Sequence, residues 1–537
     1  MSEHTNPGGA APSGGTLLAT PQSETTLADV KQLSLWAAIA SLSYVFWIVG
    51  AMEMIERLAY YGVRAVATLY ATRPVSEGGL GVTMATFGTL LLCWNLTQSV
   101  VPILTGGLAD RYGYKQTIFV STVLKCLAYL VMAWFRTYPG FFAGAMLLAL
   151  GTAIFKPGIQ GTLIKSTSRR NSSVAWGIFY QTVNIGGWIG PLFALQMRHL
   201  DWKYVFYLNA AFICLNFLLL LTYREPGLEE RLARQAQLRA AGVRQRNLAL
   251  EALSELRKPH LAAYLAIFSV WWVMFPMLWD VLPKYIEDWV DTRPMVAFLF
   301  GPDGTQSRLW HFLLGMTQDG RAIEPEGIVN INAGLIMFTC FLVAGFGAKF
   351  RAMTTMLMGT CGITAALVLF GSSRFIGLAV LAMVIFSVGE MLASPKFSEF
   401  LGNIAPPDKK AMWIGFSHVP ILIGWTIEGK LGPWLYHVFS AKDELARRML
   451  VERGYPADQV TEKALPIGEA FKKLVEFTGE SPEHLTQMLA QTHPVGMPWF
   501  IFAGIGVFSG VLIYFYGRWI ARLAAKERQP SAPKGIG

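Results

Sequence analysis

The chain has 537 residues and a net charge of +10; 53% of its residues are apolar, only 15% are charged, and its mean hydropathy is +0.40. An ordinary soluble chain is about 25% charged, so this composition excludes a typical soluble protein and indicates a membrane protein. The five cysteines all lie in apolar stretches, which excludes a disulfide framework or zinc ribbon. No P-loop, RNP or finger motif is present, which argues against ATP-driven transport and nucleic-acid binding.

The chain begins with a polar segment and continues with long apolar runs. Residues 1–33 are rich in Gly, Ser, Thr and Pro and lack the positive start and apolar core of a signal peptide, so we expect a disordered cytoplasmic tail. A helix needs about 20 residues to cross about 30 Å of hydrocarbon. We therefore predict twelve membrane-spanning helices, near residues 34–71, 82–105, 117–136, 139–165, 172–199, 203–223, 261–290, 327–349, 352–371, 375–402, 410–438 and 497–523.

Lys and Arg are concentrated in alternate loops, and this bias accounts for the positive net charge. Positively charged loops stay in the cytoplasm, so the pattern predicts an integral protein of the inner (plasma) membrane with both termini cytoplasmic. The polar segment between the sixth and seventh spans carries eight basic residues. The predicted organisation is a tail (1–33), an N-terminal six-helix bundle (34–223), a cytoplasmic linker helix (224–260), a C-terminal six-helix bundle (261–523) with outward-facing insertions at 291–326 and 440–495, and a cytoplasmic tail (524–537).

The two insertions are polar, and the second contains amphipathic stretches near 444–453 and 467–477. We interpret both as solvated loop elaborations in preference to binding modules.

The turn after the second span carries a distinctive motif. Residues 106–115 read Gly-Gly-Leu-Ala-Asp-Arg-Tyr-Gly-Tyr-Lys. This segment resembles the loop signature of the major facilitator superfamily, which implies that its glycines permit a tight turn and that Asp110 and Arg111 latch against a helix end. The resemblance implies an all-α membrane fold of twelve transmembrane helices, arranged as two six-helix bundles around a site at the membrane midplane.

Ionisable residues occur inside three of the predicted spans. Lys156 lies in the fourth span and Glu390 in the tenth, at similar depth. At about 100° per residue, one face of the first span presents Glu53, Glu56, Arg57, Tyr60 and Arg64. Charge inside a membrane is costly and indicates function by default. The alternative is a set of ion pairs that only lock the helices together.

Such a cluster is suited to proton-coupled transport. The proton affinity of a carboxylate depends on whether a cation lies beside it. When a substrate carboxylate captures that cation, the glutamate loses its partner and binds a proton more readily. Proton and substrate binding are then linked, as symport requires, and the proton-motive force takes the place of ATP.

Four segments of the chain share motifs with one transporter family. Residues 53–62 (EMIERLAYYG) look like an ExxERFxYYG element, with Leu58 in place of Phe. Residues 151–157 (GTAIFKP) look like a lysine motif of span 4, residues 179–186 (FYQTVNIG) like an FYxxINxG signature, and residues 389–395 (GEMLASP) like a span 10 motif. Together, and in this order, they resemble the proton-dependent oligopeptide transporters (POT/PTR) of the major facilitator superfamily.

The resemblance implies roles for particular residues. Glu53, Glu56 and Arg57 would form a proton-coupling triplet, with Lys156 as its salt-bridge partner. Arg64 and Lys156 would meet the carboxylate of a peptide, and Tyr60 would bond its backbone. The remaining substrate-binding residues would be Tyr180, Asn184, Asn332 and Glu390, of which the last three would receive the amino terminus.

The chain also departs from the family pattern. Pro276 stands in span 7 where the family often has an acidic residue, and no carboxylate follows until Asp280. Ala333 replaces a usual proline beside Asn332. Lys396 and Glu399 stand where apolar residues are usual, and their spacing predicts a mutual ion pair near the cytoplasmic gate. These changes bear on peptide specificity.

Three further ionisable residues are interpreted as structural. His418 lies in the middle of predicted span 11 and is expected to be a hydrogen-bonded packing residue. Glu428 and Lys430 lie near the outer end of that span and are expected to be solvated.

These observations predict a secondary transporter and not an enzyme: a proton-coupled symporter that imports di- or tripeptides, or related small amino-acid derivatives, by alternating access. We expect protons, a small peptide-like substrate and the lipid bilayer as partners, and no cofactor, metal, ATP or nucleic acid. Two alternatives stay open. One is a proton-coupled carrier of a non-peptide anion or drug-like solute; the other is a membrane receptor that binds a partner through residues 440–495.

Overall fold

The computed structural model describes residues 34–168, 170–229, 254–347, 349–404 and 416–527, together with 232–233, 236–237 and 413. Within these residues the regular structure is helical, apart from an isolated antiparallel bridge between Met316 and Ile323. The predicted all-α class is confirmed. The long helices are α2 (Tyr44–Thr72), α3 (Met84–Tyr112), α4 (Tyr114–Trp134), α5 (Tyr138–Ser166), α6 (Ser172–Arg198), α7 (Trp202–Leu221), α10 (Pro259–Met274), α15 (Pro325–Gly347), α16 (Ala352–Ser372), α17 (Ile376–Ile404), α19 (His418–Phe439) and α23 (Met497–Glu527).

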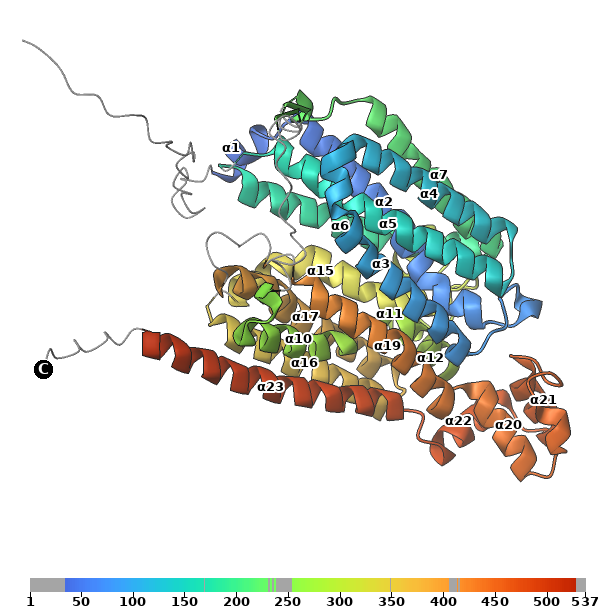
Figure 1. The fold of residues 1–537 in the computed structure, drawn as a ribbon. Helices are drawn as coiled ribbons and strands as arrows, with labels where there is room; N and C mark the ends of the chain where they lie inside the picture. Colours follow the sequence, from blue (N-terminus) through green and yellow to red (C-terminus); the bar gives the residue numbers. More distant parts are fainter. Residues whose placement is uncertain are drawn as a thin grey trace, which may run out of the picture.

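These helices pack as two bundles. In the N-terminal bundle α2 packs against α6 and α7, and α4 packs against α5. In the C-terminal bundle α16 packs against α17 and α23, and α10 packs against α19. The bundles meet where α3 contacts α19 and α6 contacts α15 (Figure 1). Each bundle therefore supplies one wall of any site that lies between them.

Two of the predicted spans are interrupted. The first divides into α1 (Leu35–Ala40) and α2, because the Ser43 side chain accepts a hydrogen bond from the amide of Phe46 and caps α2. The seventh divides into α10, α11 (Met277–Asp280) and α12 (Leu282–Trp289). Pro276 lies at the first break, where it has no amide hydrogen to continue the helical ladder.

The motif at 106–115 is more helical than expected. Helix α3 continues to Tyr112, so Asp110 and Arg111 lie in its last turn and not in the predicted loop. Gly113 alone links α3 to α4, with a φ of 115° that favours glycine. The side chains of Asp110 and Arg111 lie outside the described atoms, so their latching role stays a prediction.

The segments at 291–326 and 440–495 lie at one end of the bundles, which we call the insertion end. The first contains α13 (Arg293–Phe300) and α14 (Arg308–Leu314). The second contains α20 (Lys442–Glu452), η4 (Ala457–Val460), α21 (Glu469–Thr478) and α22 (Pro482–Thr492), which confirms the two predicted amphipathic helices. Figure 1 shows α20–α22 beside the end of α23 that begins at Met497.

Some of the long helices are apolar throughout, whereas others carry charged residues. Seven segments of the described chain are long and apolar enough to cross a membrane by length and composition: α4, α5, α7, α10–α11, α16, α17 and α23. Helix α2 is as long as most of these but carries Glu53, Glu56, Arg57 and Arg64, all of them buried. Charge that faces the protein interior keeps such a helix compatible with lipid on its other side.

The ends of the predicted domains are only partly described. Helix α23 continues to Glu527, past the predicted start of the tail at 524. Residues 1–33, residues 528–537 and most of the linker at 224–260 lie outside the described residues.

Candidate functional site

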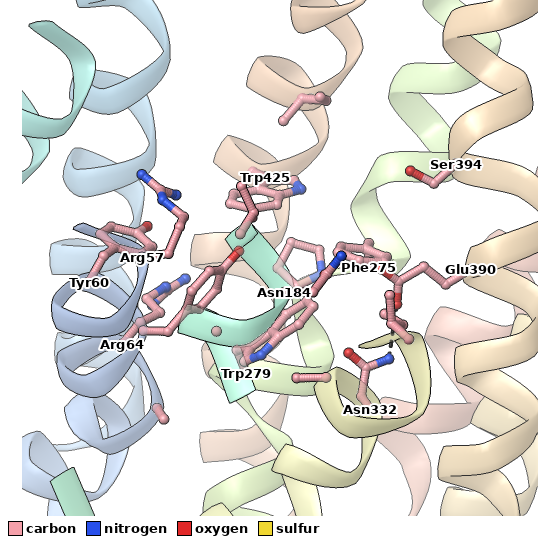
Figure 2. A pocket seen from close by; sticks show the side chains of 18 of the residues that line it. Arg57, Tyr60, Arg64, Asn184, Phe275, Trp279, Asn332, Glu390, Ser394 and Trp425 are labelled. Atoms are coloured by element: carbon pink, nitrogen blue, oxygen red, sulfur yellow. Dashed lines mark hydrogen bonds between the residues drawn. The ribbon is translucent and has the colours of Figure 1, made fainter. Parts of the chain in front are cut away.

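A cavity of about 380 Å³ lies between the two bundles. Helices α2, α3, α5 and α6 line it on one side, and α10, α11, α15, α17 and α19 line it on the other. Figure 2 shows Arg57, Tyr60 and Arg64 of α2 on one side of this space and Asn332 and Glu390 on the other. The predicted substrate-binding residues Tyr60, Arg64, Lys156, Tyr180, Asn184, Asn332 and Glu390 all line the cavity.

Glu53 and Glu56 lie behind the cavity wall, away from its lining. Both carboxylates bind Arg57: its Nε is 2.6 Å from Glu56 Oε2 and 3.2 Å from Glu53 Oε1. The guanidinium also lies over the ring of Tyr60, 5.1 Å from its centroid. Arg57 therefore joins the buried carboxylates to the cavity surface.

A second cation, Lys125 of α4, completes this cluster. Its fully buried Nζ lies 3.2 Å from Glu56 Oε1 and 3.7 Å from the centroid of the Phe155 ring. Thr152 adds a hydroxyl donor to the same Glu56 oxygen at 3.3 Å. Two carboxylates thus face two cations, as a buried cluster requires.

The structure therefore corrects the predicted pairing of Lys156. Lys125, and not Lys156, makes an ion pair with Glu56, because α4 packs on the side of α5 that faces away from the cavity. Within the described residues Lys156 makes no ion pair, and it lines the cavity next to Pro157. Sequence reasoning missed Lys125, although a charge in the middle of an apolar span was the signal that identified Lys156.

Glu390 is the acidic group of the opposite wall. The Asn332 amide donates to Glu390 Oε2 at 2.9 Å and to the Ser387 hydroxyl at 3.0 Å (Figure 2). Within the described residues no cation pairs with Glu390. Asn332 thus orients this carboxylate and leaves its charge uncompensated.

The other predicted polar residues are held by local contacts. The Tyr60 hydroxyl donates to Gln98 Oε1 at 2.9 Å, and the indole of Trp94 donates to the same oxygen at 3.1 Å. Asn184 donates to the carbonyl of Tyr180, one turn earlier on α6, at 3.0 Å. Gln98 of α3 therefore joins Tyr60 of α2 to Trp94 of its own helix.

Arg64 lies toward the insertion end of the cavity and binds a residue of the other bundle. Its Nη2 is 2.5 Å from Asp280 Oδ1, and its guanidinium lies over the Trp94 ring at 5.3 Å. Asp280 thus supplies the span 7 carboxylate that is absent at Pro276. Asp280 follows Pro276 by four residues and is the last residue of α11, beyond the break in the seventh span.

Glu428 and His418 differ from their predicted environments. Glu428 is fully buried next to Asp280, and it is not solvated at the end of a span. His418 is the first residue of α19 and lines the cavity, with its Nδ1 3.3 Å from the Ser417 hydroxyl, and it does not lie in the middle of a span. Lys430 contacts Ala85 and Thr89 of α3.

An aromatic wall faces the charged residues of α2. It is formed by Trp272, Phe275, Trp279 and Trp425. The Phe275 ring stacks on Trp425 with centroids 6.4 Å apart and lies 5.0 Å from Trp279 (Figure 2). This wall offers apolar surface to the part of a ligand that carries no charge.

At the insertion end, further ion pairs join the bundles. Arg73 Nε lies 2.6 Å from Glu287 Oε1, and Arg198 Nη2 lies 2.9 Å from Glu324 Oε2. Burial alone would raise the pKa of Glu324, but the hydrogen bond to His199 and the cations Arg198 and Arg73 lower it to about 2. All ion pairs between the bundles in the described part of the chain lie at this end or between it and the cavity.

Of the two predicted gate residues on α17, Lys396 is not among the described residues that line the cavity. Lys396 is half-buried, and the side chain of Glu399 lies outside the described atoms, so their mutual ion pair stays a prediction. One possible metal-ligand group occurs among the described residues: the ligand atoms of His437, Glu444 and Glu462 lie within 4.8 Å of one another. Glu444 is already paired with Arg447.

Comparisons with known proteins identify the family of this chain. The model of the Major Facilitator Superfamily matches residues 54–427. A di-/tripeptide transporter of Lactococcus lactis subsp. lactis is 31% identical over 147 residues, which is 26% of this chain and 29% of that protein. The chain therefore matches less than a third of the length of such curated relatives.

Two solved structures have the same fold. A peptide transporter POT in complex with sulfate superposes with a TM-score of 0.60 at 16% identity, over 92% of this chain and 99% of that chain. A POT family transporter in complex with 5-aminolevulinic acid gives a TM-score of 0.62 at 14% identity, over 88% and 96%. These relatives and structures confirm the resemblance predicted from the motifs.

Proposed function

Because this chain belongs to the Major Facilitator Superfamily, we propose that it is a secondary transporter that imports small peptides, or related small amino-acid derivatives, together with protons. The two bundles would rock about the cavity and expose it alternately to each side of the membrane. The positive loops favour an orientation with both termini in the cytoplasm, in the inner (plasma) membrane, and with the insertion end outside. Protons are the driving ions, and no cofactor or ATP takes part.

The observation that carries this proposal is one uncompensated charge on each wall. Arg57 is neutralised by the buried glutamates, and Arg64 is neutralised by Asp280. Among the described residues, Lys156 is therefore the cavity-lining cation of the N-terminal bundle that has no paired carboxylate. Glu390 provides the opposite charge on the C-terminal bundle. A zwitterion fits this pattern, with its carboxylate at Lys156 and its ammonium group at Glu390.

The size and the lining of the cavity support the same substrate class. Ligand pockets for small molecules are typically about 300–1,000 Å³, and this cavity is about 380 Å³. The aromatic wall would pack against substrate side chains, while Tyr60 and Tyr180 would bond the peptide backbone and Asn184 would help to receive its amino terminus.

Proton coupling is assigned to the cluster behind Arg57. A substrate carboxylate bound at Lys156 would also attract Arg57, which lines the same cavity. If Arg57 moves toward that carboxylate, Glu53 and Glu56 keep Lys125 as their remaining cation. One buried carboxylate would then lack a partner and would take up a proton to avoid an isolated charge. Substrate and proton would therefore bind together.

The test is uptake of labelled dialanine into proteoliposomes, with and without an inward proton gradient. We expect gradient-driven uptake by the wild type and its loss in Glu56→Gln, while counterflow exchange without a gradient survives. Glu77→Gln, an exposed glutamate in the α2–α3 turn, is the matched control and should behave as the wild type. Absence of dipeptide uptake by folded wild-type protein would refute the peptide assignment.

The aromatic wall also favours a second candidate, a proton-coupled carrier of a non-peptide, drug-like solute. Competition separates the two. Inhibition of dialanine uptake by many unrelated dipeptides supports a peptide carrier, whereas inhibition only by aromatic organic solutes supports the second candidate.

A further inference from the structure

The two short helices of the first insertion, α13 and α14, carry a group of exposed apolar side chains. Phe298 is 87% exposed and Leu309 is 61% exposed, and their sequence neighbours Leu299 and Trp310 are exposed as well. We call these four residues the apolar group. The ring centroids of Phe300 and Trp310 lie 5.8 Å apart, so the two helices that carry the group are in contact.

Helix α14 packs along the flank of the N-terminal bundle. The ring centroid of Phe312 lies 5.3 Å from that of Phe193 on α6, and Phe193 lies 5.6 Å from Phe212 on α7. Phe193 precedes Arg198, the last residue of α6, by five residues, or about 7.5 Å along the helix. Helix α7 is one of the helices that are apolar enough to cross a membrane. Helix α14 therefore lies below the end of α6, at a level where the flank of the bundle meets lipid.

The apolar group continues a pattern that the spanning helices show at the same end. Aromatic side chains are enriched where such helices meet the membrane surface. At the insertion end, exposed aromatic residues stand at the end of α4, near the start of α7 and directly before α17: Trp134, Tyr204 and Phe375. Helix α13 packs against α17. Phe298 and Trp310 thus extend an aromatic surface that belongs to the membrane interface.

The second insertion has a different surface. Residues 440–495 form the longer segment, yet their exposed large apolar side chains are Val451 and Phe477, at 42% and 46%. These two side chains lie on different helices, α20 and α21. Lysine–glutamate pairs occupy the surface of α21 instead: Lys472 with Glu469 and Lys473 with Glu476. Such charged pairs are typical of a helix that faces water.

We propose that α13 and α14 form an interfacial membrane anchor, which inserts the apolar group into the bilayer leaflet at the insertion end. Segments of this kind lie in the plane of the interface, with their apolar side chains about 5–10 Å into the boundary between headgroups and acyl chains. Transfer of the exposed apolar side chains from water into the leaflet is favourable. Residues 291–326 are then membrane-bound, and the interpretation as a solvated elaboration applies to residues 440–495 alone.

Apolar burial, and not charge, provides the attraction. Arginines and aspartates are equal in number between residues 291 and 323: Arg293, Arg308 and Arg321 against Asp291, Asp303 and Asp319. Arg293 also binds Asp291 through two hydrogen bonds of 2.9 Å. The segment therefore has no excess of positive charge for anionic headgroups. The anchor should bind neutral and anionic bilayers equally.

The anchor lies across the contact between the two bundles. Helix α13 contacts α17, and α14 contacts α15 of the C-terminal bundle and α6 of the N-terminal bundle. The Gln318 side chain also donates to the carbonyl of His199, in the turn between α6 and α7, at 3.2 Å. The anchor thus brings the leaflet against the place where the bundles meet. This inference concerns the surface of the chain and does not depend on the proposed substrate or on proton coupling.

Electron paramagnetic resonance on the full-length protein in proteoliposomes measures the depth of these residues. A nitroxide amino acid is placed singly at Phe298 or Leu309, at Leu218 on α7 as the membrane reference, and at Phe477 as the matched aromatic control in the second insertion. All four positions are exposed. Collision with oxygen, which concentrates in hydrocarbon, and with a water-soluble nickel chelate present on both sides of the bilayer gives the depth of each label.

We expect the labels at 298 and 309 to lie about 5–10 Å into the interface, accessible to oxygen and shielded from the nickel chelate, and the label at 477 to lie in water. Labels at 298 and 309 that are as accessible to the nickel chelate as the label at 477 would overturn the proposal in favour of a solvated loop. Labels shielded from both reagents would overturn it in favour of a contact with protein, such as a second copy of the chain.

Substitutions separate an anchor from a segment that protein packing alone holds at this depth. With the label at Trp310, Phe298→Ser/Leu309→Ser should move the label toward water, because the apolar attraction to the leaflet is reduced. The control pair Val451→Ser/Phe477→Ser, in the second insertion, should leave the depth unchanged. An unmoved label in Phe298→Ser/Leu309→Ser protein that retains the wild-type thermal midpoint would overturn the proposal.

Bilayer composition tests the nature of the attraction. The label at Trp310 should lie at equal depth in phosphatidylcholine and in phosphatidylglycerol liposomes, since the arginines of the segment are balanced by aspartates. A label that reaches the interface only in the anionic bilayer would show an electrostatic attachment and would overturn an anchor that depends on apolar burial. Neither outcome depends on uptake, so failure of the peptide assignment would leave these measurements unchanged.

Discussion

The fully buried Lys125 provides the sharpest test of the charge balance behind the cavity. Lys125→Met keeps the apolar stem but removes the cation 3.2 Å from Glu56 Oε1. Glu53 and Glu56 would then share Arg57 alone. Removing one partner of a buried ion pair typically costs about 3–5 kcal/mol, because it leaves an uncompensated charge. We therefore expect the free energy of unfolding to fall by about this amount.

The assay is denaturant unfolding in detergent micelles, followed by tryptophan fluorescence and circular dichroism. The double variant Lys125→Met/Glu56→Gln restores one cation to one carboxylate, so it should recover most of the lost stability. Lys463→Met, at an exposed position between η4 and α21, should change stability by less than about 0.5 kcal/mol. The reasoning is refuted if Lys125→Met is as stable as the wild type, or if the double variant is less stable than the single one.

Three further predictions follow from other parts of the molecule. Lys156→Gln should lower the affinity for a dipeptide about tenfold or more, since a hydrogen bond to a charged group contributes about 1.5–3 kcal/mol. In the same binding titration, the affinity for the corresponding C-terminal amide should change little. An equal loss of affinity for both ligands would contradict the role assigned to Lys156. Because the pKa of Glu324 is lowered from 4.5 to about 2, its ion pairs stabilise the fold fully above about pH 4.5 and lose this contribution as the pH falls toward 2. The thermal midpoint of the wild type should therefore fall more steeply over that range than that of Glu324→Gln, and parallel curves would argue against it. Gly113→Ala places a side chain at a φ of 115° and should destabilise the protein by about 1–3 kcal/mol in thermal or denaturant unfolding; an unchanged midpoint would show that the α3–α4 turn adopts another conformation.

Helical periodicity anticipated which residues share one face of α2, but not what that face contacts. Arg57, Tyr60 and Arg64 reach the cavity, whereas Glu53 and Glu56 lie behind its wall, with Glu56 bound to Lys125 of α4. An arc of about 100° is wide enough to meet both a cavity and a neighbouring helix. Rotation of α2 between its neighbours decides how the arc is divided, and the pattern of a single helix carries no information on that rotation.

Helix packing also explains why Glu428 is buried and not solvated as the sequence predicted. Its position near the end of a predicted span suggested water, yet the residue packs against Asp280 of the broken seventh span. The break itself was readable at Pro276, but the approach of α19 to α11 was not. A contact between residues 148 positions apart (280 and 428) depends on how the intervening helices pack.

Composition and local pattern alone determined the membrane class, the positions of nearly all the long helices, and the set of ionisable residues that the chain places within them. These properties follow from the length of an apolar run, the cost of burying charge, and proline or glycine at fixed points, all of which act within a few turns of chain. Only the tertiary structure decided which cation neutralises which carboxylate, and so which charges remain for a ligand. Lys125 and Lys156 are both lysines in apolar spans, but helix packing turns one toward Glu56 and the other into the cavity, because Coulomb energy depends on distances of a few ångströms between separate helices.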